Sequence, residues 1–156
     1  NPGNVQSQIV GVYSEDVQKI YGEVLLKLKR KKSIIVTGGN GMDEININGI
    51  NKILTPGGNI STFLASSIGI INQDERQLNG GDALYNASRI KDIFSGTNDA
   101  FYEIVLLNSA FALSLNDVET LTPDMIKEKY LIAKEIVDSG EAMNKLNQLI
   151  NYTQGI

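Results

Sequence analysis

The sequence contains no cysteine and no histidine, and these absences narrow the chemistry open to the protein. Without cysteine there are no disulfides and no thiolate nucleophile, and without either residue there is no Cys/His zinc site. Histidine is also the most common general acid or base in enzymes. Any proton transfer would therefore fall to carboxylates, lysine or tyrosine.

An excess of basic charge is lacking as well. The chain has 14 lysines and arginines against 18 acidic residues, a formal net charge of −4. A general nucleic-acid binder needs a basic surface that neutralises phosphates. The one basic cluster, residues 27–32, falls at the end of a predicted helix, where cations complement the helix dipole. Nucleic acid is therefore not an expected partner.

Long apolar runs and a secretory signal are also missing, so the sequence predicts no membrane contact and a cytoplasmic location. The 156 residues are enough for one domain with its own core. An apolar content of 42% and a charged content of 21% are ordinary for a globular protein.

The first third of the chain predicts a βαβ unit. A strand is expected at residues 9–13, and Ser14 is a plausible N-cap for an amphipathic helix that reaches about Arg30. The β-branched run at residues 33–37 predicts a buried second strand. A strand, helix and strand of this length form a right-handed unit, so the two strands should be parallel.

The remainder predicts a small antiparallel element followed by helices. Residues 45–54 form short apolar stretches, Pro56-Gly57-Gly58 supplies a turn, and a return strand is expected near Ile60. Four helices follow, at residues 83–94, at 99–115, from Thr122-Pro123 to Val137, and from about Ser139. The predicted class is α/β, with a partial and mostly parallel sheet flanked by helices, a small antiparallel element and a helical C-terminal half.

The most informative stretch follows the second predicted strand: Gly38-Gly39-Asn40-Gly41-Met42-Asp43-Glu44-Ile45. Its glycines allow a sharp turn, and the turn places Asp43 and Glu44 at the carboxyl end of the strand, where open α/β sheets bind ligands. Carboxylate oxygens are hard ligands of the kind Mg²⁺ takes, usually one or two from protein. The glycine spacing matches neither a dinucleotide fingerprint nor a P-loop. The stretch is a candidate metal–phosphate site, and a solvated surface turn is the alternative.

Several other residues predict structural roles. Asp82 precedes a helix and is expected to cap it. Asn108 falls in the most apolar helix, and buried amides usually bond to nearby backbone, so it is expected to anchor a loop rather than to contact substrate. Tyr13, Tyr21 and Tyr130 fall on predicted apolar faces and are expected in the core.

Five segments taken in series resemble anthranilate phosphoribosyltransferase, an enzyme family of tryptophan biosynthesis. Asn1-Pro2 with residues 8–13 resemble its pattern "NP…Q-x-VGVY", and residues 36–45 resemble "VHGxDGLDEI". Residues 78–87 resemble "L-x-GGDAxxNA", residues 105–110 resemble "VLLNAA", and residues 138–146 resemble "DSGKALxKL". The order is the family's, and the matches cover essentially the whole chain. Thr37, Met42, Asn46 and Glu141 stand where the family usually has histidine, leucine, serine and lysine. None of these departures removes the acidic pair.

The resemblance implies a transfer reaction. The family displaces diphosphate from C1 of phosphoribosyl diphosphate with the amino nitrogen of anthranilate, and its acidic pair, here Asp43 and Glu44, helps to hold Mg²⁺ with the diphosphate. The two residues would be metal ligands without a proton-transfer role. The family's fold is a small helical domain joined to a larger α/β domain, with the active cleft between them.

The resemblance covers about the second half of the family's sequence. Its glycine loop for the diphosphate, its KHGN-type segment, its anthranilate-facing arginine and its helical domain, which forms the dimer contact, have no match here. Residues 1–156 are therefore expected to form one partial domain that is inactive alone, and the complete protein is expected to be a homodimer. No catalytic residue is assigned. The alternatives are a pyrimidine nucleoside phosphorylase of the same superfamily and a non-catalytic α/β interaction module.

Overall fold

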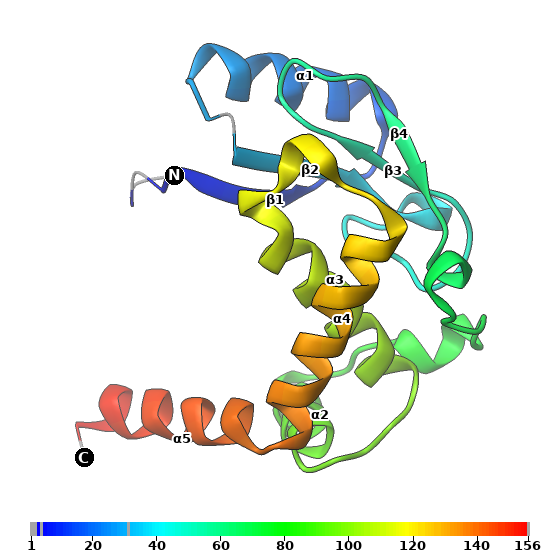
Figure 1. Cartoon of the computed structure of the whole chain (residues 1–156). Coiled ribbons are helices and arrows are strands. Elements are labelled where there is room, and N and C mark those ends of the chain that lie inside the picture. Colours follow the sequence, from blue (N-terminus) through cyan, green and yellow to red (C-terminus); the bar gives the residue numbers. More distant parts are fainter. Residues whose placement is uncertain (1–2, 4, 31, 156) are drawn as a thin grey trace.

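A computed structural model describes residues 3, 5–30 and 32–155. Asn1 and Pro2, part of the first resembling segment, and Lys31 of the basic cluster lie outside the described residues. The helices and strands in chain order are β1 (Ser7–Gly11), α1 (Glu15–Lys27), β2 (Lys32–Thr37), β3 (Asn51–Leu54), β4 (Ser61–Phe63), α2 (Ala83–Phe94), α3 (Ala100–Leu113), α4 (Pro123–Asp138) and α5 (Glu141–Gln154) (Figure 1).

The four strands form one sheet in the order β1-β2-β3-β4. β1 pairs with β2 in parallel, as the βαβ prediction requires, and the other two pairs are antiparallel. The predicted α/β class and the antiparallel element are confirmed. That element joins the sheet at β2, so the sheet is mixed rather than mostly parallel, and its parallel pairing is confined to β1 and β2.

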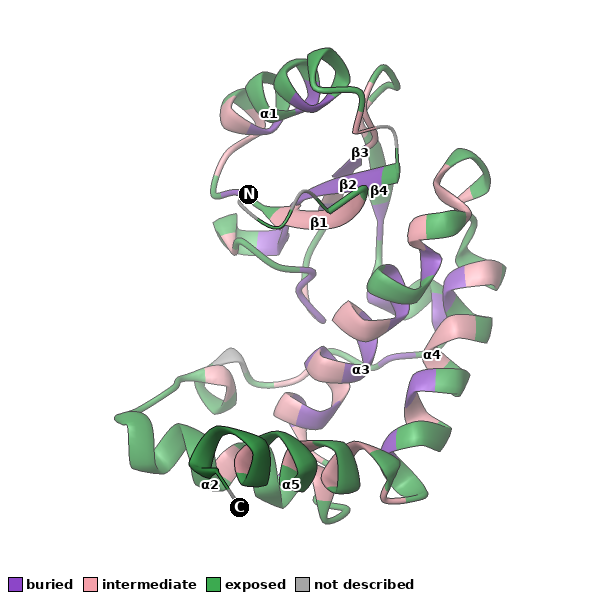
Figure 2. Ribbon diagram, turned by 90° about the vertical axis from the view of Figure 1, so that its left-hand side faces the viewer, coloured by how far each residue is buried: buried purple, intermediate pink, exposed green. Residues whose placement is uncertain are grey.

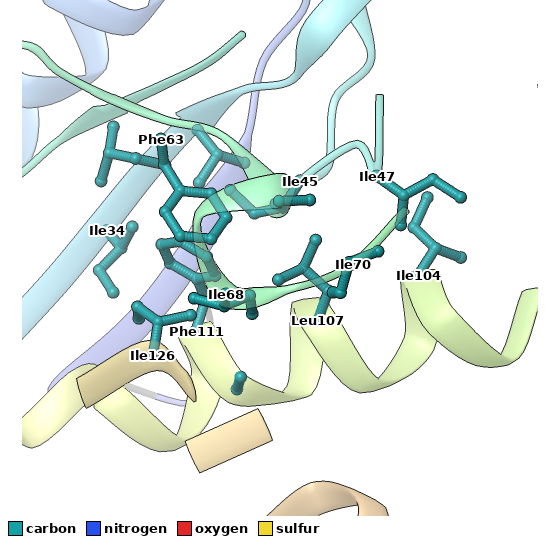
Figure 3. Close-up of a cluster of buried hydrophobic side chains, with 14 of the residues drawn as sticks. Ile34, Ile45, Ile47, Phe63, Ile68, Ile70, Ile104, Leu107, Phe111 and Ile126 are labelled. Carbon is teal, nitrogen blue, oxygen red and sulfur yellow. The ribbon is translucent and has the colours of Figure 1, made fainter. Parts of the chain in front are cut away.

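Side chains of β2 alternate between the two faces of the sheet, and each face has its own cover. Ile35 packs with Leu25 of α1 and Leu54 of β3, whereas Ile34 and Val36 belong to the main cluster under α3 and α4. Figure 1 shows α1 on one side of the sheet and α3 with α4 on the other. Figure 3 shows the main cluster, which joins the sheet, the segment that carries Ile68 and Ile70, and α3.

Three of the predicted helix starts, those of α1, α2 and α4, are confirmed by capping bonds. Ser14 Oγ accepts from Val17 N at 3.4 Å, Asp82 Oδ1 from Tyr85 N at 2.8 Å, and Thr122 Oγ1 from Met125 N at 3.3 Å. The first helix ends at Lys27 rather than near Arg30. Lys29 takes a left-handed conformation with φ of 58°, and this turns the chain back toward β2.

α1 buries only part of the apolar face expected for it. Leu25 belongs to that face and is buried against the sheet, but the other buried residues of the helix are Gln18 and Gly22. Gln18 Nε2 donates to the carbonyls of Ile35 and Lys52, at 2.8 Å each, so it joins α1 to β2 and β3. These two donated bonds hold the Gln18 side of α1 against the sheet, while Gln18 Oε1 is buried without a hydrogen-bond partner among the described residues.

The predicted core positions of Tyr13 and Tyr21 are wrong, and other large apolar side chains of this segment are exposed with them. Exposed on or beside α1 are Tyr13 (71%), Ile20 (59%), Tyr21 (43%), Val24 (45%) and Leu28 (61%). Tyr130 on α4 is partly buried against the main cluster, in keeping with its expected place. Figure 2 shows the exposed outer surfaces of α1, α2 and α5. Among the described helices, none has both the length and the apolar character needed to cross a bilayer.

The main cluster should carry most of the stability of the described fold. Leu107 on α3 is fully buried, so Leu107→Ala should lower the free energy of unfolding by about 2–5 kcal/mol. The matched change Leu84→Ala removes a side chain that is 83% exposed and should alter it by less than about 0.5 kcal/mol. Urea denaturation followed by circular dichroism measures both. Equal losses in the two variants would contradict this account of the core.

Candidate functional site

The acidic stretch forms a loop at the carboxyl ends of β1 and β2. It begins directly after β2, and Gly39–Gly41 form one 3₁₀ turn. Gly38 N donates to Met42 O at 2.8 Å, which closes the turn. Positive φ values occur at Asn40 (61°) and Gly41 (78°). The predicted position of the turn is therefore confirmed. The left-handed backbone conformation is taken by Asn40 as well as by a glycine, Gly41.

Two glycines allow this loop to lie directly against the strands. A Cβ on Gly11, the last residue of β1, would lie 1.4 Å from the carbonyl oxygen of Asp43. A Cβ on Gly38 would lie 2.0 Å from the carbonyl oxygen of Glu44. Neither distance is compatible with a side chain, so the acidic pair sits where it does because both positions are glycine. Nothing in the sequence around Gly11 indicates this role.

Asparagines satisfy the backbone inside the loop. Asn51 Oδ1 accepts from Asn46 N at 2.7 Å and from Gly39 N at 3.2 Å, and Asn51 Nδ2 donates to Asn46 O at 2.9 Å. Asn46 Nδ2 donates to Gly39 O at 3.0 Å. Asn48 Nδ2 donates to Gln73 O, and Asn48 Oδ1 accepts from Gln73 N. Asn46 and Asn51 are fully buried, and their contacts replace the backbone pairing that a strand or helix would supply.

Asn108 on α3 reaches the same loop from across the main cluster. Its Oδ1 accepts from Ile45 N and its Nδ2 donates to Ile45 O, both at 2.9 Å. The sequence-based prediction that Asn108 anchors a loop is confirmed. The loop that it anchors is the acidic one, which the sequence did not indicate because 63 residues separate the two partners.

Both carboxylates of the acidic pair are exposed. Among the described residues, neither Asp43 nor Glu44 has a side-chain hydrogen bond or an ion pair. Burial of part of the Glu44 carboxyl raises its pKa above the ordinary value, and the neighbouring charge of Asp43 raises it further. The pair is therefore an uncompensated negative site at the strand ends.

The chemistry of this donor set suits a hard cation. Two carboxylates offer oxygen ligands without competition from lysine or arginine, and Mg²⁺ typically takes one or two such ligands and completes its shell with water and phosphate oxygens. Within the part of the chain that the structure describes, no group of three or more acidic side chains is assembled to hold a metal. A cation bound by Asp43 and Glu44 would thus depend on further ligands from solvent or substrate.

A shallow hollow of about 280 Å³ adjoins the acidic loop. Its walls include Tyr13 and Tyr21, on and beside α1, together with Met42 and Asp43 of the loop. The two tyrosines that were expected in the core are therefore partly exposed beside the acidic pair.

The third resembling segment forms a separate loop before α2. Asn86 Oδ1 accepts from Gly81 N at 2.9 Å, and its Nδ2 donates to Gly81 O at 3.0 Å. Together with the cap at Asp82, these bonds fix the Gly80-Gly81 turn, and the expected helix cap at Asp82 is confirmed. Ser139 and Gly140 form the boundary between α4 and α5, as the sequence predicts.

Comparison with known proteins adds to this geometry. The family model described as "Glycosyl transferase family, a/b domain" matches residues 1–143. The chain is similar to the anthranilate phosphoribosyltransferase of Geobacter sp. (strain M21), with 36% identity over 98% of this chain and 43% of that protein. It is also similar to that of Acetivibrio thermocellus, with 33% identity over 98% of this chain and 44% of that protein. The chain thus spans less than half the length of these relatives.

Solved structures show the same fold. Anthranilate phosphoribosyltransferase from Saccharomyces cerevisiae, in complex with PRPP and Mg, superposes with a TM-score of 0.85 and 22% identity over 98% of this chain and 43% of that one. The enzyme from Thermus thermophilus gives a TM-score of 0.80 and 23% identity over 92% of this chain and 42% of that one. At these identities the likeness concerns the fold, and it confirms the mixed α/β architecture.

The contact between β1 and the acidic loop can be tested at Gly11. Gly11→Ala should lower the free energy of unfolding by about 1–3 kcal/mol or more, because its Cβ would overlap the Asp43 carbonyl. Gly80→Ala is the matched control, since its Cβ would meet only the Asn86 side chain, at 3.2 Å. Urea denaturation of both variants gives the comparison. If Gly11→Ala is no more destabilising than Gly80→Ala, the close packing described here is wrong.

Proposed function

Because the chain belongs to the glycosyl transferase family of the α/β-domain type, we propose that it is part of a Mg²⁺-dependent anthranilate phosphoribosyltransferase. The observation that carries this proposal is the acidic pair Asp43-Glu44, which lies at the strand ends without a neutralising partner among the described residues. The pair belongs to a chain of which 98% is similar to that enzyme. In the proposed reaction the anthranilate nitrogen bonds to C1 of phosphoribosyl diphosphate. The bond from C1 to the diphosphate oxygen breaks, diphosphate leaves with the electron pair of that bond, and the anthranilate nitrogen releases one proton to solvent.

We assign Asp43 and Glu44 the role of holding Mg²⁺ with the diphosphate. When bound, the cation would balance the negative charge that grows on the departing diphosphate. The raised pKa of Glu44 supports this assignment, because a cation beside two adjacent carboxylates offsets both the cost of burial and their mutual repulsion. Neither carboxylate has a hydrogen-bonded partner among the described residues that would pass on a proton, so both are proposed as ligands only.

The contribution of this chain is one part of the proposed activity. It spans 43% and 44% of the two relatives described above, and the contacts to anthranilate and most of those to the diphosphate are proposed to lie outside it. Residues 1–156 are proposed to be a single partial α/β domain. The complete enzyme is proposed to be a cytoplasmic homodimer, as the family resemblance implies. None of the comparisons supports a nucleoside phosphorylase or a non-catalytic module.

A chimera tests the proposal without requiring this chain to act alone. The matching segment of the Geobacter enzyme is replaced by residues 1–156, and the loss of anthranilate fluorescence is followed with phosphoribosyl diphosphate and Mg²⁺. We expect turnover that depends on Mg²⁺. A folded chimera that leaves anthranilate unchanged, or that turns over uridine or thymidine with phosphate instead, would contradict the proposal.

The metal role is tested in the same chimera by Asp43→Asn with Glu44→Gln. The double variant should lower kcat/KM by at least about a hundredfold, because it removes the charge that holds the cation. It should leave the free energy of unfolding within about 0.5 kcal/mol, since both side chains are exposed.

The control for this double variant is Asp124→Asn with Glu135→Gln, which removes the same two charges from exposed positions on α4. It should retain turnover. Equal activity in the acidic-loop variant and the α4 variant would remove Asp43 and Glu44 from the proposed mechanism.

A further inference from the structure

The carboxamide of Asn108 is oriented by more bonds than a simple loop contact requires. Its Nδ2 donates to Ile104 O, one turn earlier in α3, as well as to Ile45 O, each at 2.9 Å, while its Oδ1 accepts from Ile45 N. The bond to its own helix fixes the side-chain rotamer. The other two bonds involve the backbone N–H and the backbone carbonyl of Ile45. A shift or rotation of the Ile45 backbone would therefore break both hydrogen bonds.

The helix that carries Asn108 is the most firmly packed in the described structure. Ile104, Leu107 and Phe111 of α3 lie in the main cluster with Ile45 itself (Figure 3). Ile45 is fully buried, whereas the preceding Glu44 is exposed. The chain therefore passes from the core to the acidic pair within one peptide unit, at the point that Asn108 holds.

We propose that Asn108 is a positioning residue of the cation site. Its amide fixes the Ile45 peptide and thereby sets the position and direction of the Glu44 and Asp43 carboxylates toward a bound divalent cation. The inference rests on the proposed function. It adds helix α3 to the loop residues that form the cation site. Groups that orient ligands in this way typically change metal affinity by about 10- to 100-fold when they are removed.

The chain contains its own control for this inference. Asn86 on α2 makes the same pair of bonds to Gly81, with its Oδ1 accepting from the backbone N and its Nδ2 donating to the backbone O. Asn86→Ala and Asn108→Ala thus each remove two contacts to a loop residue, and Asn108→Ala also removes the bond to Ile104 O within its own helix. Only Asn108 holds the residue next to the acidic pair.

The first test measures Mn²⁺ binding to the chain by electron paramagnetic resonance of the free ion, because Mn²⁺ accepts the same oxygen ligands as Mg²⁺. Asn108→Ala should raise the dissociation constant by at least about tenfold, and Asn86→Ala should change it by less than about twofold. Asp43→Asn with Glu44→Gln should abolish the binding. Circular dichroism at the titration temperature confirms that each variant is folded.

The outcomes separate the inference from the function on which it rests. Mn²⁺ binding that is insensitive to the Asp43 and Glu44 changes would refute the proposed metal site, and the positioning role with it. Binding that is lost in that double variant but unchanged in Asn108→Ala would overturn the positioning role alone. Equal weakening by Asn108→Ala and Asn86→Ala would also overturn it, because the effect would then come from general loosening.

A second measurement needs no substitution, and so it holds even if Asn108→Ala fails to fold. In the wild-type chain labelled with nitrogen-15, titration with Mg²⁺ should shift the side-chain amide resonances of Asn108 and leave those of Asn86 in place. An Asn108 resonance that stays fixed while the Asp43 and Glu44 resonances move would contradict the inference.

Discussion

The structure of the acidic loop, residues 38–49, depends on hydrogen bonds from asparagine side chains, because the loop has almost no secondary structure of its own. Residues 38–49 run across the ends of β1 and β2, so their backbone groups lack the partners that strands would provide. Asn46 supplies those partners from inside the loop, Asn51 from the start of β3, and Asn108 from α3. A buried polar group without a partner costs about 1–3 kcal/mol, so these side chains determine the shape of the loop.

The same constraint explains how the core and the acidic pair are connected. Residues of α3 pack in the main cluster, and Asn108 of α3 bonds to the backbone of Ile45. Ile45 directly follows the acidic pair. The glycines at positions 11 and 38 complete the arrangement, since they let the loop backbone contact the strands. Asp43 and Glu44 are consequently exposed side chains on a well-held backbone. That arrangement suits the binding of a cation whose remaining ligands come from substrate and solvent.

Much of the fold could be predicted because its signals are local. The caps at Ser14 and Thr122, the buried strand 33–37 and the acidic turn each depend on a few neighbouring residues. The buried face of α1 could not be predicted from its apolar residues, because it includes Gln18, whose side chain donates to the carbonyls of two strands. The contact of Gly11 with the Asp43 carbonyl and the bonds between Asn108 and Ile45 join residues far apart in sequence. The sequence predicts that Asn108 anchors a loop but does not indicate which one, and it does not indicate the contact of Gly11.

The most direct test of the central claim is to locate the cation. A crystal of this chain grown with Mn²⁺ and inorganic diphosphate would show the metal through its anomalous scattering. The account predicts a metal peak within bonding distance of a carboxylate oxygen of Asp43 or Glu44, with diphosphate oxygens completing its shell. Metal and diphosphate bound together elsewhere on the chain, with the acidic loop empty, would contradict it.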